Sequence, residues 1–368
     1  MRNRKRFPVI FCRSILLATA WILACVVESA FVASAPSLLP ERSGRQNVHA
    51  GASADDSQVH ILPVQGRVYM LVGAGANITV QVGEDGILLV DTGLATMSDK
   101  VLAAIRSLSD KPIRYIIDTS VDQDHTGGSL AIAKAGSTIA GGNVLGDIGT
   151  SATEGAAVIS FQTILARMSA ANTTDAAPEG AWPTDTYRAP QKNLFVNDEA
   201  VQILHVPAAH TDGDSIVFFR RSDVVSAGDI FTTTGYPVID LARGGSIQGV
   251  IDALNVLLYR ITVSGPKQEG GTLIIPGHGR LSDQADLVVY QEMVIIIRDR
   301  IQAMIEKGMT LDQVKAASPT SDYDPIYGAT TGPWTTDMFI EAVYKSLVTK
   351  NGTAPSGVAP SAPQGKLE

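Results

Sequence analysis

The sequence predicts a layered α/β fold, because short apolar runs typical of strands alternate with helical patterns along most of the chain. Ile87–Val90 is a fully apolar run of the kind that forms a strand buried on both faces. Polar clusters come directly after several such runs, and the ends of buried strands are the favoured place for a site in these folds. A helical pattern follows, with one apolar face made by Val101, Leu102, Ile105 and Leu108.

The expected elements follow one another in a regular order. Strands are expected at Val59–Leu71, Ile78–Val82, Ile87–Val90, Ile113–Ile117, Val201–Val206, Ile216–Phe219, Val224–Ser226 and Leu273–Ile275. Helices are expected at Gly249–Tyr259 and Leu287–Glu306. The glycine-rich stretch Gly73–Asn77 is not followed by a helix, so we interpret it as a hairpin turn rather than a phosphate loop.

The N-terminus has the order of a secretory signal peptide. Basic residues precede an apolar run at Ser14–Val27, and small residues follow up to Ala35. Because the run is shorter than the roughly 20 residues of a spanning helix, we expect cleavage after Ala35, with acylation at Cys25 as the alternative. The mature protein is then expected in the periplasm or the medium, with no membrane insertion. N-terminal sequencing that finds Met1 on membrane-bound protein would contradict this expectation.

The composition of the expected mature chain excludes several kinds of site. Cys12 and Cys25 both fall within residues 1–35, so the mature chain has neither disulfides nor cysteine ligands. Loss of residues 1–35 leaves 24 basic and 36 acidic residues and a formal charge of −12. An acidic chain without a basic run is a poor candidate for binding nucleic acid. We therefore expect a small-molecule substrate as the partner.

Composition also suggests how the mature chain is divided. We expect a linker at residues 36–57, a catalytic domain at 58–308, a C-terminal helical extension at 309–350 and a disordered tail at 351–368. The extension carries a capping signal at Thr310 and a helical pattern at Thr335–Val348. We take this extension to pack against the domain or to mediate contacts in a homodimer.

Four clusters at the ends of expected strands supply nearly all candidate metal ligands. Each lies in a loop marked by glycine or proline. Carboxylate and imidazole groups together suit zinc or a similar divalent ion. The clusters are Ser120–His125, His210, Asp229 and His278.

The order and spacing of these clusters resemble the metallo-β-lactamase superfamily, whose signature is H-x-H-x-D-H followed by His, a bridging Asp or Cys, and a final His. The resemblance covers roughly residues 58–285, and the Asp91-Thr92-Gly93 turn also matches the family pattern. It implies an αββα sandwich with a dinuclear metal site at one edge of the paired sheets, here followed by the C-terminal helical extension.

Carried over residue by residue, the resemblance shows one departure. Asp124, His125, His210, Asp229 and His278 match the signature, whereas Ser120 and Asp122 replace its first two histidines, giving S-x-D-x-D-H. The family pattern then assigns Asp124, His125 and His278 to the second metal, with Asp229 shared between the two metals.

The first metal position keeps His210 and gains the carboxylate of Asp122, while Ser120 is a weak ligand and a remnant of that position. We therefore expect one or two Zn²⁺ ions, with Mn²⁺ or iron as alternatives for an oxygen-rich first position.

Such a site predicts hydrolysis, since a divalent ion lowers the pKa of its water to about 7. We expect the resulting hydroxide to attack the carbonyl of a lactone, ester, thioester or β-lactam, with Asp124 orienting it as the catalytic residue. Weak β-lactamase activity is among the expected activities. The rival hypotheses are a non-catalytic binding protein of the same fold and an iron-dependent redox enzyme.

Substrate contacts are expected from the segment between the second and third ligand clusters. Residues 142–191 form an insert with a helical part that includes Val158 and Phe161. After it come Trp182 and Tyr187, which we expect either to contact the substrate or to anchor the loop to the core.

Overall fold

The computed structural model describes residues 58–138, 155–261 and 271–351. The expected signal peptide and linker, and nearly all of the expected tail, lie outside these residues. All described residues belong to one compact unit of the chain. Within these ranges, no helix combines the length and apolar character needed to cross a bilayer.

Two sheets form the centre of the unit. The first has seven strands in chain order: β1 (His60–Gln65), β2 (Val68–Val72), β3 (Ile78–Gly83), β4 (Gly86–Val90), β5 (Ile113–Ile117), β6 (Ala157–Phe161) and β7 (Asp185–Tyr187). Its strands are antiparallel up to β4 and parallel from β4 to β7.

The second sheet has five strands, in the order β12 (Leu273–Ile275), β11 (Val224–Ser226), β10 (Ser215–Phe219), β9 (Glu199–His205) and β8 (Gln191–Val196). Among the described strands of this sheet, β11 and β12 pair in parallel and the other neighbours are antiparallel. The two sheets pack face to face through a shared core that includes Val90, Ile117, Val201 and Phe219.

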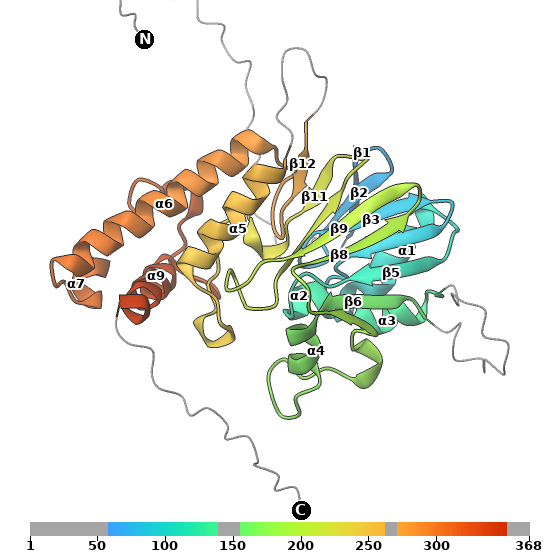
Figure 1. Ribbon diagram of the computed structural model, residues 1–368, viewed down its shortest axis with the longest axis horizontal. Coiled ribbons are helices and arrows are strands. Elements are labelled where there is room, and N and C mark those ends of the chain that lie inside the picture. The colour runs from blue at the N-terminus through green and yellow to red at the C-terminus, as the bar shows by residue number, and fades with distance from the viewer. Residues whose placement is uncertain (1–57, 139–154, 262–270, 352–368) are drawn as a thin grey trace, which may run out of the picture. The chain divides into compact units, whose positions relative to one another are not determined.

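Helices cover the outer face of each sheet, as Figure 1 shows. Outside the first sheet lie α1 (Ser98–Leu108) and α3 (Ser129–Lys134), whose Val101, Ile105 and Ile132 are buried against it. Outside the second sheet lie α5 (Ile247–Arg260), α6 (Gln284–Glu306) and α9 (Thr336–Asn351). The expected αββα sandwich is confirmed.

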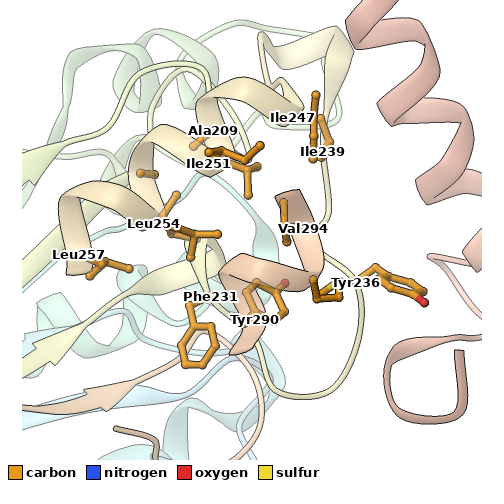
Figure 2. Packing of buried hydrophobic residues seen from close by; sticks show 14 of the residues in the cluster. Ala209, Phe231, Tyr236, Ile239, Ile247, Ile251, Leu254, Leu257, Tyr290 and Val294 are labelled. Atoms are coloured by element: carbon orange, nitrogen blue, oxygen red, sulfur yellow. The ribbon is translucent and has the colours of Figure 1, made fainter. Parts of the chain in front are cut away.

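The C-terminal helices share the core of the second sheet. Figure 2 shows Ile251 and Leu254 of α5 facing Tyr290 and Val294 of α6, and Phe339 of α9 is buried in the same cluster. The remaining helices are α2 (Gln123–Thr126), α4 (Gln162–Met168), α7 (Leu311–Ala316) and α8 (Asp324–Tyr327). The helix signal at Thr310 is confirmed, because its side chain accepts from Gln313 N in a capping box.

Two sequence expectations about strands are wrong. The run Val59–Leu71 is two strands rather than one, with a turn at Gly66, whose φ of +60° suits glycine. Val158 and Phe161 belong to β6 rather than to a helix. Because this strand leads directly into α4, the apolar positions on either side of the junction imitate a helical period.

Candidate metal centre

All six expected ligands meet at one edge of the sandwich, each in a loop or short helix that follows a strand. Two groups place their ligand atoms within 4.8 Å of one another: Asp124, His125 and His278, and Asp122, His210 and Asp229. We call the site formed by Asp124, His125, His278 and Asp229 the second position. We call the site formed by Asp122, His210 and Asp229 the first position. The strand ends bring together residues up to 156 positions apart in the sequence, from Asp122 to His278.

Asp229 lies between the two positions. Its Oδ1 is 3.1 Å from His125 Nε2 and 3.5 Å from His278 Nε2, and its Oδ2 is 3.7 Å from His210 Nδ1. Asp124 Oδ2 lies 3.2 Å from His278 Nε2. A carboxylate that faces imidazoles on both sides has the geometry expected of a bridging ligand.

Asp91 fixes the orientation of His125. The imidazole is fully buried, and its Nδ1 donates to Asp91 Oδ2 over 2.8 Å. Asp91 is held in turn by Thr119, whose backbone N–H donates over 2.8 Å and whose hydroxyl donates over 2.7 Å. The Nε2 of His125 therefore points into the site, where it lies 3.1 Å from Asp229 Oδ1 without forming a well-aligned hydrogen bond among the described residues. A buried nitrogen placed in this way beside carboxylates fits a metal ligand.

Asp91 adopts a φ of +65°, a left-handed conformation that aspartate tolerates better than most residues. It stands at the end of β4, where the sequence showed only a match to the family turn. Its contact with His125, 34 residues along the chain, could not be read from that match.

The carboxylates dominate the electrostatics of the site. Burial alone would lower the pKa of His125, but Asp229 and Asp91 outweigh it and hold the pKa well above its usual value. Burial would raise the pKa of Asp229, yet His125, His210 and His278 hold it well below its usual range. The same negative field that favours protonated imidazoles favours a bound divalent cation. The residues of the second position therefore fit a metal ion.

Metal binding is expected to release protons. Burial lowers the pKa of His210, but Asp214, Asp229 and Asp122 outweigh burial and raise it to about 9. In the metal-free protein His210 is thus protonated at pH 7 and must lose its proton to bind a metal, so affinity should rise with pH up to about 9. Titration calorimetry of metal-free protein at pH 7.5, in two buffers of different ionisation enthalpy, should show net proton release. Equal heats in both buffers would contradict this prediction.

The same shift makes the metal-free fold pH-dependent. Because the pKa of His210 is raised in the folded state, the stability that its ion pairs contribute is fully present below pH of about 6.5 and is lost as pH rises through about 9. A His210→Gln variant is the control, because this loss of folding stability with rising pH should be absent from it.

The first position differs from the second in its surroundings. Asp122 directs Oδ2 toward His210 Nε2, 3.4 Å away. Ser120 donates its hydroxyl to that same oxygen over 2.8 Å, and Arg243 donates Nη1 to the other oxygen over 2.8 Å. Asp214, which Thr211 holds through two hydrogen bonds, lies 3.4 Å from His210 Nδ1. No sequence pattern points to Arg243, because it lies outside every ligand cluster in the sequence and 121 positions from Asp122.

The glycine-rich hairpin borders the candidate site. Ala76 N donates to Asp124 O over 3.1 Å, and Asn77 N donates to Gly277 O over 2.8 Å. A side chain at Gly277 would place its Cβ 2.5 Å from Asp229 Oδ1. Close backbone packing thus holds the loops of Asp124 and Asp229 in place.

The two expected substrate contacts occupy structural positions. Tyr187 is 6% exposed in the core between the sheets and hydrogen-bonds Ser215. Trp182 donates its Nε1 to Ala177 O and packs beside Val121. These contacts favour the alternative that both residues anchor their segment.

Replacing Asp91 by asparagine is expected to lower metal affinity by about 10- to 100-fold, because His125 loses the carboxylate that accepts the hydrogen bond of its Nδ1 and orients the ring. An amide can present its oxygen to His125 but cannot supply the negative charge. Metal affinity of the purified variant, measured by chelator competition, checks the result. Asp223→Asn, which removes a carboxylate at the start of β11 that hydrogen-bonds Thr272 instead, is the control.

The chain resembles known proteins in sequence and in fold. A family model described as the metallo-beta-lactamase superfamily matches residues 72–278, from the end of β2 to the last expected ligand. The chain is 24% identical over 257 residues to the linear primary-alkylsulfatase of Pseudomonas sp., an alignment that covers 62% of this chain and 47% of that protein.

Solved structures with the same fold include the stereoselective inverting sec-alkylsulfatase Pisa1 from Pseudomonas sp. It matches with a TM-score of 0.56 at 15% identity, over 78% of this chain and 50% of that one. A metallo-beta-lactamase from Pontibacter korlensis matches with a TM-score of 0.48 at 14% identity, over 65% of this chain and 99% of that one. The chain therefore spans about half the length of the two sulfatases.

Proposed function

The chain belongs to the metallo-β-lactamase superfamily, and from that premise we propose that it is a metal-dependent hydrolase of small-molecule esters, with sulfate esters as the first substrate class. The observation that carries the proposal is the convergence of Asp124, His125, His278 and Asp229 on one point. These residues form the oxygen and nitrogen ligand set of a catalytic divalent metal.

Exposure of the ligands indicates where a substrate approaches. The side chains of His125 and His210 are 0% and 4% exposed, whereas those of Asp124 and His278 are 33% and 34% exposed. The buried imidazoles form the floor of the site, and Asp124 and His278 form its open side. A scissile bond would therefore reach the metal past Asp124 and His278.

A divalent ion in the second position would supply Lewis acidity, lowering the pKa of a water and polarising the scissile group. The chain's own residues supply the orientation. Burial would raise the pKa of Asp124, but the hydrogen bond with His278 and the charge of His125 outweigh burial and lower this pKa. Asp124 is thus ionised at neutral pH, and its carboxylate accepts a hydrogen bond from the attacking water and orients it.

The choice of sulfate esters rests on the sequence relative, since the chain aligns with a linear primary-alkylsulfatase over 62% of its own length. The carbonyl substrates expected from the sequence, namely lactones, esters, thioesters and β-lactams, share the requirement for a polarised oxygen and an attacking water. They form the second arm of the test.

The test combines elemental analysis of the purified protein with a hydrolysis screen over alkyl sulfates, lactones, carboxylic esters, thioesters and β-lactams. We expect at least one bound metal per chain and turnover that a chelator abolishes and added metal restores. Turnover of a carbonyl substrate without any of a sulfate ester would overturn the choice of substrate class.

Other results would favour the rival hypotheses. Iron with no hydrolytic activity would indicate redox chemistry, and purification without metal and without metal uptake would indicate a binding protein. Asp124→Asn should keep most of the bound metal and lose turnover, because the amide still offers an oxygen but orients the water poorly. Equal turnover of this variant would remove Asp124 from the catalytic role.

A further inference from the structure

Arg243 joins the first metal position to a segment that supplies none of the six expected ligands. Its guanidinium donates Nη1 to Asp122 Oδ1 over 2.8 Å and Nε to Asp175 Oδ2 over 3.1 Å, and Nη2 also pairs with Asp175. Asp175 lies after α4, in the segment between β6 and β7. Asp240 Oδ2 completes the surroundings at 3.2 Å from Nη1.

The backbone around Arg243 is fixed as firmly as its side chain. Its carbonyl accepts from Asp212 N over 3.0 Å and from Arg167 Nη2 over 3.1 Å. Asp240 N donates to His210 O over 3.0 Å, so the same loop also holds the backbone of a ligand. The side chain of Arg243 is only 23% exposed. Its charge therefore has a defined place beside Asp122.

This charge opposes a cation in the first position. The second position has two imidazoles and two carboxylates, counting Asp229. The first position has one imidazole, the shared Asp229, and an Asp122 whose oxygens are taken by Arg243 and Ser120. A positive charge close to a dication is strongly unfavourable at the dielectric constant of a partly buried site.

We infer that Arg243 makes the metal site asymmetric: one ion binds tightly in the second position, and Arg243, neutralised in part by Asp175, sets the weaker affinity of the first. The inference rests on the metal binding of the proposed function and adds how occupancy is controlled. Residues 162–181 then influence the charge beside the first position through Asp175.

Two single variants test this because they should act in opposite directions. Arg243→Gln removes the opposing charge, so the affinity for the second equivalent of metal should rise by about tenfold or more. Asp175→Asn removes a charge that neutralises Arg243, so the same affinity should fall. If the Arg243–Asp175 contact had a purely structural role, the affinity for the second equivalent would change in the same direction in both variants.

The measurement is a stepwise titration of metal-free full-length protein with Zn²⁺ in competition with a chromophoric chelator. A parallel titration with Co²⁺ should show spin coupling between two ions at a lower metal ratio in Arg243→Gln than in the parent protein. Arg243→Lys keeps the charge and should keep the weak second equivalent. Arg167→Gln is the matched control, because Arg167 pairs with Asp212 and the same carbonyl but forms no hydrogen bond or ion pair with Asp122 among the described residues.

Each result has one meaning. An unchanged or lowered second affinity in Arg243→Gln, or shifts of the same sign in Arg243→Gln and Asp175→Asn, would overturn the inference while leaving the proposed function intact. Failure of the parent protein to bind even one equivalent would instead refute the metal-dependent hydrolase. Should Arg243→Gln fold poorly, Asp175→Asn still gives the sign of the effect, with Arg243→Lys as the variant that keeps the charge.

Discussion

Replacing Asp229 by alanine is expected to lower metal affinity by more than about 100-fold. Loss of a residue that only orients a ligand costs about 10- to 100-fold, and Asp229 would itself be a ligand of both positions. Asp229 is the carboxylate that faces all three imidazoles, through Oδ1 toward His125 and His278 and through Oδ2 toward His210. Without it, the pKa of His125 and the pKa of His210 should both fall, which by itself would ease metal binding. The loss of a ligand shared by both positions outweighs that gain.

Turnover should fall by about 100-fold or more with the metal, since a bound ion contributes several kcal/mol to the stabilisation of a transition state. His125→Ala and His278→Ala should show the same pattern, because each removes a ligand of the second position. Metal content after dialysis and turnover at saturating substrate are the two measurements.

His205→Ala is the matched control for the histidine variants. His205 is a half-buried histidine at the end of β9, stacked on Phe161 with ring centroids 3.4 Å apart, and it belongs to neither metal group. Its replacement should leave metal content unchanged. Full metal occupancy in any two of the three ligand variants would mean that the ligand assignment is wrong.

Much of the fold was predictable because its strands are short, apolar and buried. Ile113–Ile117, Val224–Ser226 and Leu273–Ile275 begin and end in the structure where their apolar runs do. The long helices were predictable for a similar reason, since α5 and α6 bury one face against the second sheet.

Strands that lack such a run could not be predicted. Only the second half of Gln191–Val196 is apolar, because it is an edge strand whose side chains alternate between the core and solvent. Asp185–Tyr187 has three residues, too few to show a period. Both strands form edges of their sheets, where one neighbour is enough to hold them.

Some residues of the site could likewise be predicted from the sequence, and others could not. Its six expected ligands stand at strand ends and follow a known order, so the sequence was sufficient to name them. Asp91 and Arg243 act through contacts with His125 and Asp122 that join residues 34 and 121 positions apart. No local pattern records such contacts, because they depend on how the loops pack.

The altered residues of the first position give the second large prediction. Ser120→His combined with Asp122→His would create a three-histidine site with His210, which suits zinc better than the present carboxylate and hydroxyl. If the native site is a weakened zinc site, zinc uptake should rise toward two ions per chain and activity should rise with it. If it is an oxygen-rich site for manganese or iron, the same double change should shift preference to zinc and reduce native activity.

Arg243 sharpens this experiment. The double change would leave its guanidinium without Asp122 and next to a neutral imidazole, so its charge would still oppose the added zinc. The triple variant that adds Arg243→Gln should therefore bind the second zinc more tightly than the double variant, by about tenfold or more. Zinc affinities of the two variants, measured side by side, give the comparison.

The cost of the new side chains must be separated from the effect on the metal. Ser120 is 1% exposed, and a larger residue in a packed position destabilises a fold by about 1 to 3 kcal/mol. Thermal melting of the metal-free variants measures that cost. Asp122→Ala avoids it, since it removes the carboxylate without adding volume. We expect this variant to lose the second equivalent of metal and much of the turnover, and unchanged metal content with unchanged turnover would leave a one-metal enzyme or a binding protein as the better description.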